Sequence, residues 1–193
     1  MGNSKGSSRV RAAGALVFLG AVIFTLAMLI AEGLRPTYSV SQRFISDLGV
    51  GANAWVFDYA IITLGALIVI GGILLLTSGW KQVWVFTIII TGIGAAGVGI
   101  FTEGSPDGLH TIFSAITFIF AGISSIAFIV RKDTMLRYLS PIMGIISLTA
   151  LVLFETGNYY GIGQGGMERM IVYPALLWAT AVSAFLMSYR GEA

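Results

Sequence analysis

The chain has 193 residues, of which 56% are hydrophobic and only 10% are charged, and its mean hydropathy is +0.90. Soluble domains carry about 25% charged residues. The composition therefore excludes a soluble globular domain, a disordered chain and a nucleic-acid-binding protein, and it indicates an integral membrane protein. The chain has no cysteine, which excludes disulfides, a thiolate nucleophile and a cysteine-ligated metal.

Six apolar stretches alternate with short polar segments. Each is close to the roughly 20 residues that a helix needs to cross about 30 Å of hydrocarbon, and in lipid the backbone polar groups must be bonded within the helix itself. The expected spans are Ala12–Ala31, Trp55–Thr77, Val83–Phe101, Leu109–Val130, Tyr138–Phe154 and Met170–Tyr189. We therefore predict an all-α, polytopic membrane protein whose six transmembrane helices form a single bundle.

Lysine and arginine predict the orientation of this bundle. With six spans both termini lie on one side, and that side holds eight of the eleven basic residues and two of the nine acidic ones. The positive-inside rule then predicts N-in and C-in, in the cell membrane, with residues 1–11 and 190–193 as cytoplasmic tails around a transmembrane domain of residues 12–189. The longest loop and a glycine-rich loop both fall on the extracytoplasmic side, so we expect the function there.

Ionisable groups from five of the six helices gather at this outer boundary. Such a group costs about 2.5–3.5 kcal/mol in hydrocarbon, so these side chains are expected to face the bundle and to pair. The candidate acid/base or cation-binding groups are Asp47, Asp58, Glu103, His110 and Glu168. The candidate ligand-binding residues are Arg43, Arg169, Ser46 and Tyr173.

The two arginines are expected to hold a phosphate or another anion, and Asp47 and Asp58 are their expected partners. The structural alternative is an interfacial rim of helix caps and solvated loop charges. The cluster matches no catalytic motif, so enzymatic activity is left open. No H-x-x-x-H or D-x-D spacing supports a metal site, and the sequence identifies no cofactor.

Two further features have structural interpretations. The run Gly92–Gly97 matches G-x-G-x-x-G, but it lies inside a span instead of between a strand and a helix. Gly92, Ala96 and Gly99 are therefore expected to form a small-residue face for close approach of helices. Aromatic residues near the helix ends, among them Trp80 and Trp84, are expected to be interfacial anchors.

Three segments resemble a known family: SQRFISDLG at Ser41–Gly49, GIFTE at Gly99–Glu103 before His110, and GGMERMIVYP at Gly165–Pro174. They are similar to the uncharacterised six-helix membrane proteins catalogued as domain of unknown function 998. The resemblance implies six spans in one membrane domain and implies no activity. A more distant likeness to the Frag1/DRAM/Sfk1 group, some of whose members act in lipid remodelling, is an analogy.

Three functions are compatible with these features. The preferred hypothesis is a protein that binds or processes a lipid headgroup at the extracytoplasmic leaflet, with the bilayer as its surroundings. The second is a non-enzymatic subunit that assembles with another membrane protein. The third, a small transporter, ranks last because the centres of the six spans carry no ionisable residue, and transport sites usually need one there.

Overall fold

The computed structural model describes residues 2–191, so Met1 and residues 192–193 of the expected tails lie outside the described part. Its six long helices are α1 (Gly2–Gly33), α2 (Ala54–Thr77), α3 (Val83–Ile100), α4 (Leu109–Ala127), α5 (Leu136–Glu155) and α6 (Gly163–Met187). Short 3-10 helices are η1 (Ser46–Gly49), η2 (Pro106–Gly108) and η3 (Phe128–Val130).

All six long helices have the length and apolarity needed to cross a membrane, which confirms the prediction of an all-α, six-span protein. The side of the membrane on which the termini lie stays a prediction. The largest differences from the expected bounds are at two helix starts: α1 begins at Gly2 instead of Ala12, and α6 begins at Gly163 instead of Met170. The expected bounds followed apolar composition, whereas helical hydrogen bonding continues into polar residues. Glu168 and Arg169 consequently lie inside α6.

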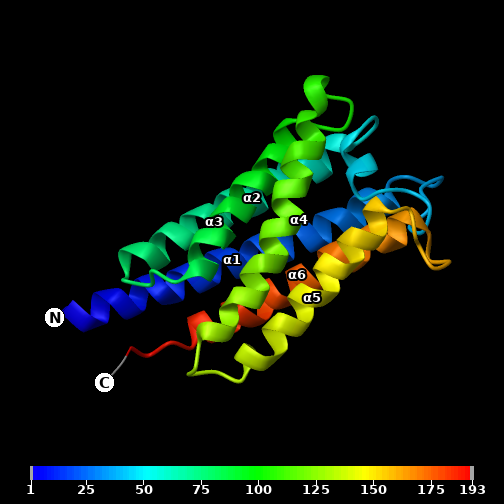
Figure 1. The fold of residues 1–193 in the computed structure, drawn as a ribbon. Helices are drawn as coiled ribbons and strands as arrows, with labels where there is room; N and C mark the ends of the chain where they lie inside the picture. The colour runs from blue at the N-terminus through cyan, green and yellow to red at the C-terminus, as the bar shows by residue number, and fades with distance from the viewer. Residues whose placement is uncertain (1, 192–193) are drawn as a thin grey trace.

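The helices form a ring, in which each packs against the next along the chain and α6 returns to α1 (Figure 1). α4 also contacts α6 directly, so α5 lies outside against these two helices. Both termini lie at one end of the bundle, which we call the terminal end. The loops of residues 34–53, 101–108 and 156–162 lie at the other end, which we call the loop end.

Small residues let α2 and α3 approach closely. A Cβ on Gly65 would lie 2.4 Å from the Gly92 carbonyl oxygen, and one on Gly99 would lie 2.7 Å from the Asp58 carbonyl oxygen. Any side chain at these positions would force the two backbones apart. The expected role of this glycine face in helix contact is confirmed.

Aromatic side chains fill the terminal end of the bundle. Trp84 and Phe128 have ring centroids 5.1 Å apart, and Phe128 lies 6.1 Å from Trp178. Trp80 is 8% exposed and Trp84 is fully buried, so the prediction that these two tryptophans are interfacial anchors is wrong. Each turns inward because neighbouring helices supply an aromatic core that buries its large apolar area. This cluster closes the bundle at the terminal end.

Candidate functional site

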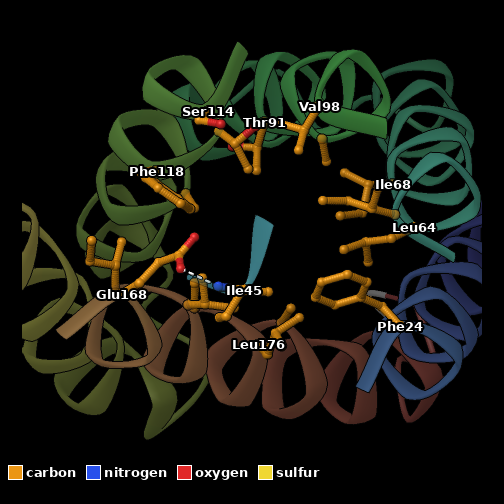
Figure 2. Close-up of a pocket in the computed structure, with 18 of the residues that line it drawn as sticks. Phe24, Ile45, Leu64, Ile68, Thr91, Val98, Ser114, Phe118, Glu168 and Leu176 are labelled. Atoms are coloured by element: carbon orange, nitrogen blue, oxygen red, sulfur yellow. Dashed lines mark hydrogen bonds between the residues drawn. The ribbon is translucent and has the colours of Figure 1, made fainter. Parts of the chain in front are cut away.

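An interior cavity runs along the axis of the ring (Figure 2). Side chains of α1, α2, α3, α4 and α6 line it, α5 contributes none, and Ile45 and Ser46 cover its loop end. The cavity has a volume of about 100 Å³. This is several times the roughly 10–15 Å³ that one water molecule needs. The lining is almost entirely aliphatic and aromatic, with Phe24, Leu64 and Leu176 on three of its sides.

Among the described residues that line this cavity, Glu168 is the only one with an ionisable side chain. It is 5% exposed. Its Oε2 accepts a short hydrogen bond from the backbone N–H of Ile45. Its other carboxyl oxygen points into the cavity (Figure 2) and has no hydrogen-bond partner within residues 2–191. This oxygen faces the open space of the cavity, so a donor from outside the chain can reach it.

The two threonine hydroxyls of the cavity wall already donate to their own helices. Thr91 donates to the Thr87 carbonyl oxygen at 3.0 Å, and Thr117 donates to the Phe113 carbonyl oxygen at 2.8 Å. A hydroxyl that has used its proton retains lone pairs that can accept. Ser114, predicted from its spacing to share a face with Thr117, also lines the cavity.

Arg169 fixes the loop that covers the cavity. Its Nη1 donates to the carbonyl oxygens of Val40 and Gly165 at 2.8 and 2.9 Å, and its Nη2 donates to Glu32 at 2.5 Å and to the Tyr38 hydroxyl at 2.8 Å. The arginine is 4% exposed. Removing one partner of such a buried ion pair costs about 3–5 kcal/mol, because the other charge is left uncompensated. Arg169 therefore has a structural position that joins α6, α1 and the loop.

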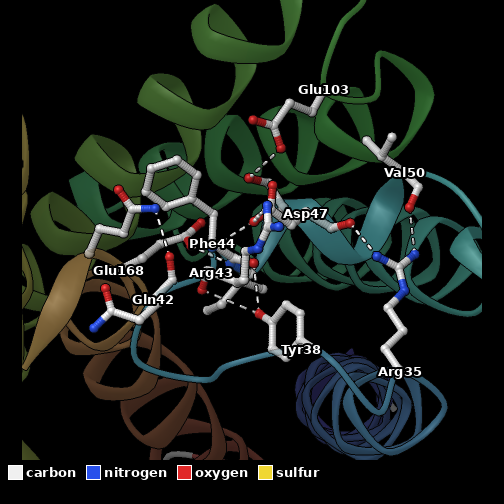
Figure 3. A network of polar contacts seen from close by, with 12 residues as sticks. Arg35, Tyr38, Gln42, Arg43, Phe44, Asp47, Val50, Glu103 and Glu168 are labelled. Atoms are coloured by element: carbon white, nitrogen blue, oxygen red, sulfur yellow. Dashed lines mark hydrogen bonds and ion pairs between the residues drawn. The ribbon is translucent and has the colours of Figure 1, made fainter.

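Tyr38 connects this arginine to the cavity cover (Figure 3). Its hydroxyl accepts from Arg169 and donates to the Phe44 carbonyl oxygen at 2.7 Å. Burial raises the pKa of Tyr38, so the hydroxyl keeps the proton that it donates. The next residue, Ile45, donates its N–H to Glu168. The hydrogen bonds therefore run without interruption from α1 to the cavity carboxylate.

The glycine-rich start of α6 lies directly against the same loop. The Gly165 N–H donates to the Ser41 carbonyl oxygen at 2.9 Å, and a Cβ on Gly165 would lie 2.0 Å from the Arg43 carbonyl oxygen. Gly163 has φ +77°, and a Cβ there would lie 2.1 Å from the Ser41 carbonyl oxygen. Close backbone contact, together with a left-handed conformation, therefore explains why this segment is rich in glycine.

Arg35 holds the second half of the loop, as Figure 3 shows in part. Its guanidinium donates to four carbonyl oxygens: Asp47 at 2.6 Å, Leu48 at 2.9 Å, Val50 at 2.6 Å and Ala52 at 3.0 Å. These carbonyls belong to η1 and to the segment that follows it. No sequence pattern identifies Arg35, Glu32 or Tyr38 as loop-holding residues, because their partners are backbone groups or residues far along the chain.

The structure brings four predicted site residues together at the cavity cover. Ser46 donates to Glu103 at 3.3 Å, Glu103 lies within hydrogen-bonding reach of Asp47, and Arg43 lies 3.9 Å from Asp47. Burial, followed by the nearby Asp47 carboxyl, raises the pKa of Glu103. Two adjacent carboxyl groups favour the sharing of one proton. Glu168 lies close enough to interact electrostatically with both acids.

Asp58 lies against Gly49 of η1, and neither Asp58 nor His110 lines the cavity. The Asp58 Oδ1 is buried with no hydrogen-bond partner among the described residues, and a Cβ on Gly49 would lie 2.6 Å from it. His110 Nδ1 lies 2.8 Å from the Phe101 carbonyl oxygen. Because a carbonyl only accepts, Nδ1 carries the proton.

The predicted pairing of arginines with acids is confirmed for Arg43 with Asp47. It is wrong for Arg169, whose partner is Glu32 instead of Asp58. The structure places Tyr173 elsewhere, in an apolar groove on the outside of the bundle between α1 and α6. Leu176 lines both this groove and the central cavity, so it lies between the two spaces. The described residues contain no group of three or more potential metal ligands.

A family match covers most of the chain: the family described as "Protein of unknown function (DUF998)" matches residues 18–184. The chain belongs to the DUF998 family. The match includes the loop, both halves of the Glu32–Arg169 pair and every residue that lines the cavity. It confirms the resemblance seen in the sequence, and the family description assigns no activity. No curated protein and no solved structure matches this DUF998 chain.

The contact between α6 and the loop predicts an unusual effect of a glycine substitution on stability. Gly→Ala inside a helix normally stabilises by about 1 kcal/mol. In this DUF998 protein, Gly165→Ala should instead destabilise by about 1–3 kcal/mol, because its Cβ overlaps the Arg43 carbonyl oxygen and overpacking costs that much. The matched control is Gly166→Ala, whose Cβ would meet only the side chain of Ile162, at 3.1 Å. Thermal unfolding in detergent should show a lower melting temperature for Gly165→Ala alone; equal melting temperatures would contradict the docked loop.

The raised pKa of Glu103 predicts a pH dependence of stability. The pKa of Glu103 is higher in the folded protein than its ordinary value of 4.5. Its contribution to the free energy of unfolding is therefore fully present below pH 4.5, and it is lost as the pH rises through the pKa of the folded state. Glu103→Gln resembles the protonated acid, so its melting temperature should exceed that of the wild type at neutral pH. The difference should disappear near about pH 4. The exposed Glu155 provides the control, Glu155→Gln; a pH-independent effect of Glu103→Gln would contradict the assignment.

Proposed function

We propose that this DUF998 protein binds a membrane amphiphile, with a hydrocarbon chain in the central cavity and the polar end of the molecule at Glu168. The observation that carries the proposal is the combination of an apolar cavity with one buried carboxylate, one oxygen of which has no hydrogen-bond partner in residues 2–191. A ligand with an apolar body and one polar end satisfies both parts at once.

The apolar wall supports a hydrocarbon chain as the occupant. An empty apolar cavity destabilises a protein by roughly 24 cal/mol per Å³, so filling this one would contribute on the order of 2 kcal/mol. The cavity extends from Ile45 at the loop end to Trp178 beside the aromatic cluster. Its long axis follows the helices, which is the direction of acyl chains in a bilayer.

The wall next to the bilayer supports access from the membrane. The groove between α1 and α6 is apolar, and its two threonines, Thr25 and Thr180, bond to their own helices at 2.8 Å. Leu176 lies between this groove and the cavity. A change in the rotamer of Leu176 would connect the two spaces, so a chain could move from the bilayer into the bundle without crossing the loop end.

Binding has more support than chemistry on the headgroup. Thr91 and Thr117 donate to backbone carbonyls and make no contact with a base, whereas a hydroxyl nucleophile needs one. The Asp47–Glu103 pair lies outside the cavity cover. Processing of a headgroup therefore stays a prediction. We place the site at the extracytoplasmic leaflet of the cell membrane, as the distribution of lysine and arginine predicts.

Filling the cavity tests the proposal. Ala121 lines it and is 9% exposed, whereas Ile119 on the same helix is 40% exposed toward the lipid. In native mass spectra of gently extracted protein, we expect an amphiphile adduct on the wild type and on Ile119→Phe, reduced at least about tenfold on Ala121→Phe by steric exclusion. Thermal unfolding checks that Ala121→Phe is folded.

An adduct of equal abundance on both variants would place the amphiphile outside the cavity and contradict the proposal. A second polypeptide bound in place of any lipid would also contradict it, and would support the hypothesis of an assembly subunit.

A further inference from the structure

We infer that the polar end of the bound amphiphile is a positively charged hydrogen-bond donor, of the primary ammonium class, and that Glu168 recognises it. This inference rests on the proposed function and names the class of ligand. It replaces the anion that the sequence led us to expect, because the structure shows which donors and acceptors remain available at the end of the cavity.

Glu168 and the two threonines of the cavity wall present acceptors to the cavity, and Ser114 adds one further hydroxyl. Glu168 is the buried carboxylate, 5% exposed, with one oxygen bonded to the Ile45 N–H and the other aimed into the space (Figure 2). Thr91 and Thr117 have donated their protons to their own helices. A phosphate or carboxylate brings only further acceptors, whereas an ammonium group brings three donors and no acceptor.

The arginines near the loop end do not face the cavity. Arg169 donates through Nη1 and Nη2 to the loop, α1 and α6, and its buried Nε has no partner among the described residues, but the side chain does not line the cavity. Arg35 donates to four backbone carbonyls. The side chain of Arg43 is 63% exposed and lies beside Asp47. None of the three is placed to neutralise an anion in the cavity.

Charges of both signs surround Glu168, and the positive Arg169 acts on it more strongly than the neighbouring acids do. Glu103 and Asp47 interact electrostatically with it across the cavity cover. Arg169, the adjacent residue of α6, is paired with Glu32. A cation at Glu168 would be attracted by all three acids and would form a charge-assisted hydrogen bond, which is shorter and stronger than a neutral one. An anion at the same place would be repelled by them.

Three amphiphiles with one chain and different ends test the inference: dodecylamine, dodecanol and dodecyl phosphate. Full-length protein in nanodiscs is incubated with each, and retained ligand is measured by native mass spectrometry. We expect dodecylamine to be retained at least about tenfold more than dodecyl phosphate on the wild type. The preference should be lost in Glu168→Gln and kept in the matched control Glu155→Gln, because Glu155 is exposed on α5.

The design separates this inference from the function on which it rests. The carbonyl oxygen of a glutamine can still accept the Ile45 N–H, so Glu168→Gln keeps the cover in place. Equal retention of the three amphiphiles, or a preference for the phosphate, would overturn the ammonium class while the cavity remained a chain-binding site. Retention of none of them would overturn the proposed function itself. Dodecylamine retained by Ala121→Phe as strongly as by the wild type would show surface binding and would also overturn the inference.

Discussion

Arg169 is buried within α6, and its guanidinium bonds to α1, to the long outer loop and to its own helix. A charge in this position must be paired, since an uncompensated ion in a membrane bundle is strongly unfavourable. Glu32 supplies the opposite charge, and Tyr38 extends the network to Phe44. The loop has no regular secondary structure apart from η1, so this network, together with Arg35, determines where Ile45 and Ser46 lie. The loop end of the cavity depends on it.

The glycines of the chain allow the contacts that this network needs. Gly165 brings the start of α6 against the loop backbone, and Gly65 and Gly99 bring α2 against α3. Close contact at these positions contrasts with the open space at the axis of the ring. There the walls are large apolar side chains that do not meet, and the carboxylate of Glu168 is aimed between them. A bundle that packs tightly between neighbours and leaves its axis open has space for the occupant that we propose.

The six helices could be predicted from the sequence because apolar composition over a membrane-spanning length is a strong signal. Helix starts were less predictable, since α1 and α6 continue through polar residues. The sequence places Ser46, Asp47 and Glu103 at one boundary but does not tell whether they converge; in the structure they do. The pairing of Glu32 with Arg169 was not predicted, because 137 residues separate them and spacing along a helix carries no information at that range. The central cavity was also not predicted, because it depends on which side chains of five helices fail to touch.

The predicted anion-binding role of Arg43 and Arg169 stays a prediction. The geometry supports another role for Arg169, as the structural residue that positions the cavity cover. This difference arises because residue type alone identifies arginine as a phosphate ligand, whereas its actual role depends on how many of its donors the chain itself has used. For Arg35 and for the two Nη atoms of Arg169, backbone carbonyls, Tyr38 and Glu32 use them.

The central claim, that the axis of the bundle holds an amphiphile, is tested most directly by cryo-electron microscopy of the protein extracted with its native lipids into nanodiscs. The account predicts continuous, elongated density along the cavity, with one end at the free oxygen of Glu168 and the other toward Trp178. A cavity without such density, or one closed by the collapse of Phe24, Leu64 and Leu176 onto one another, would contradict it.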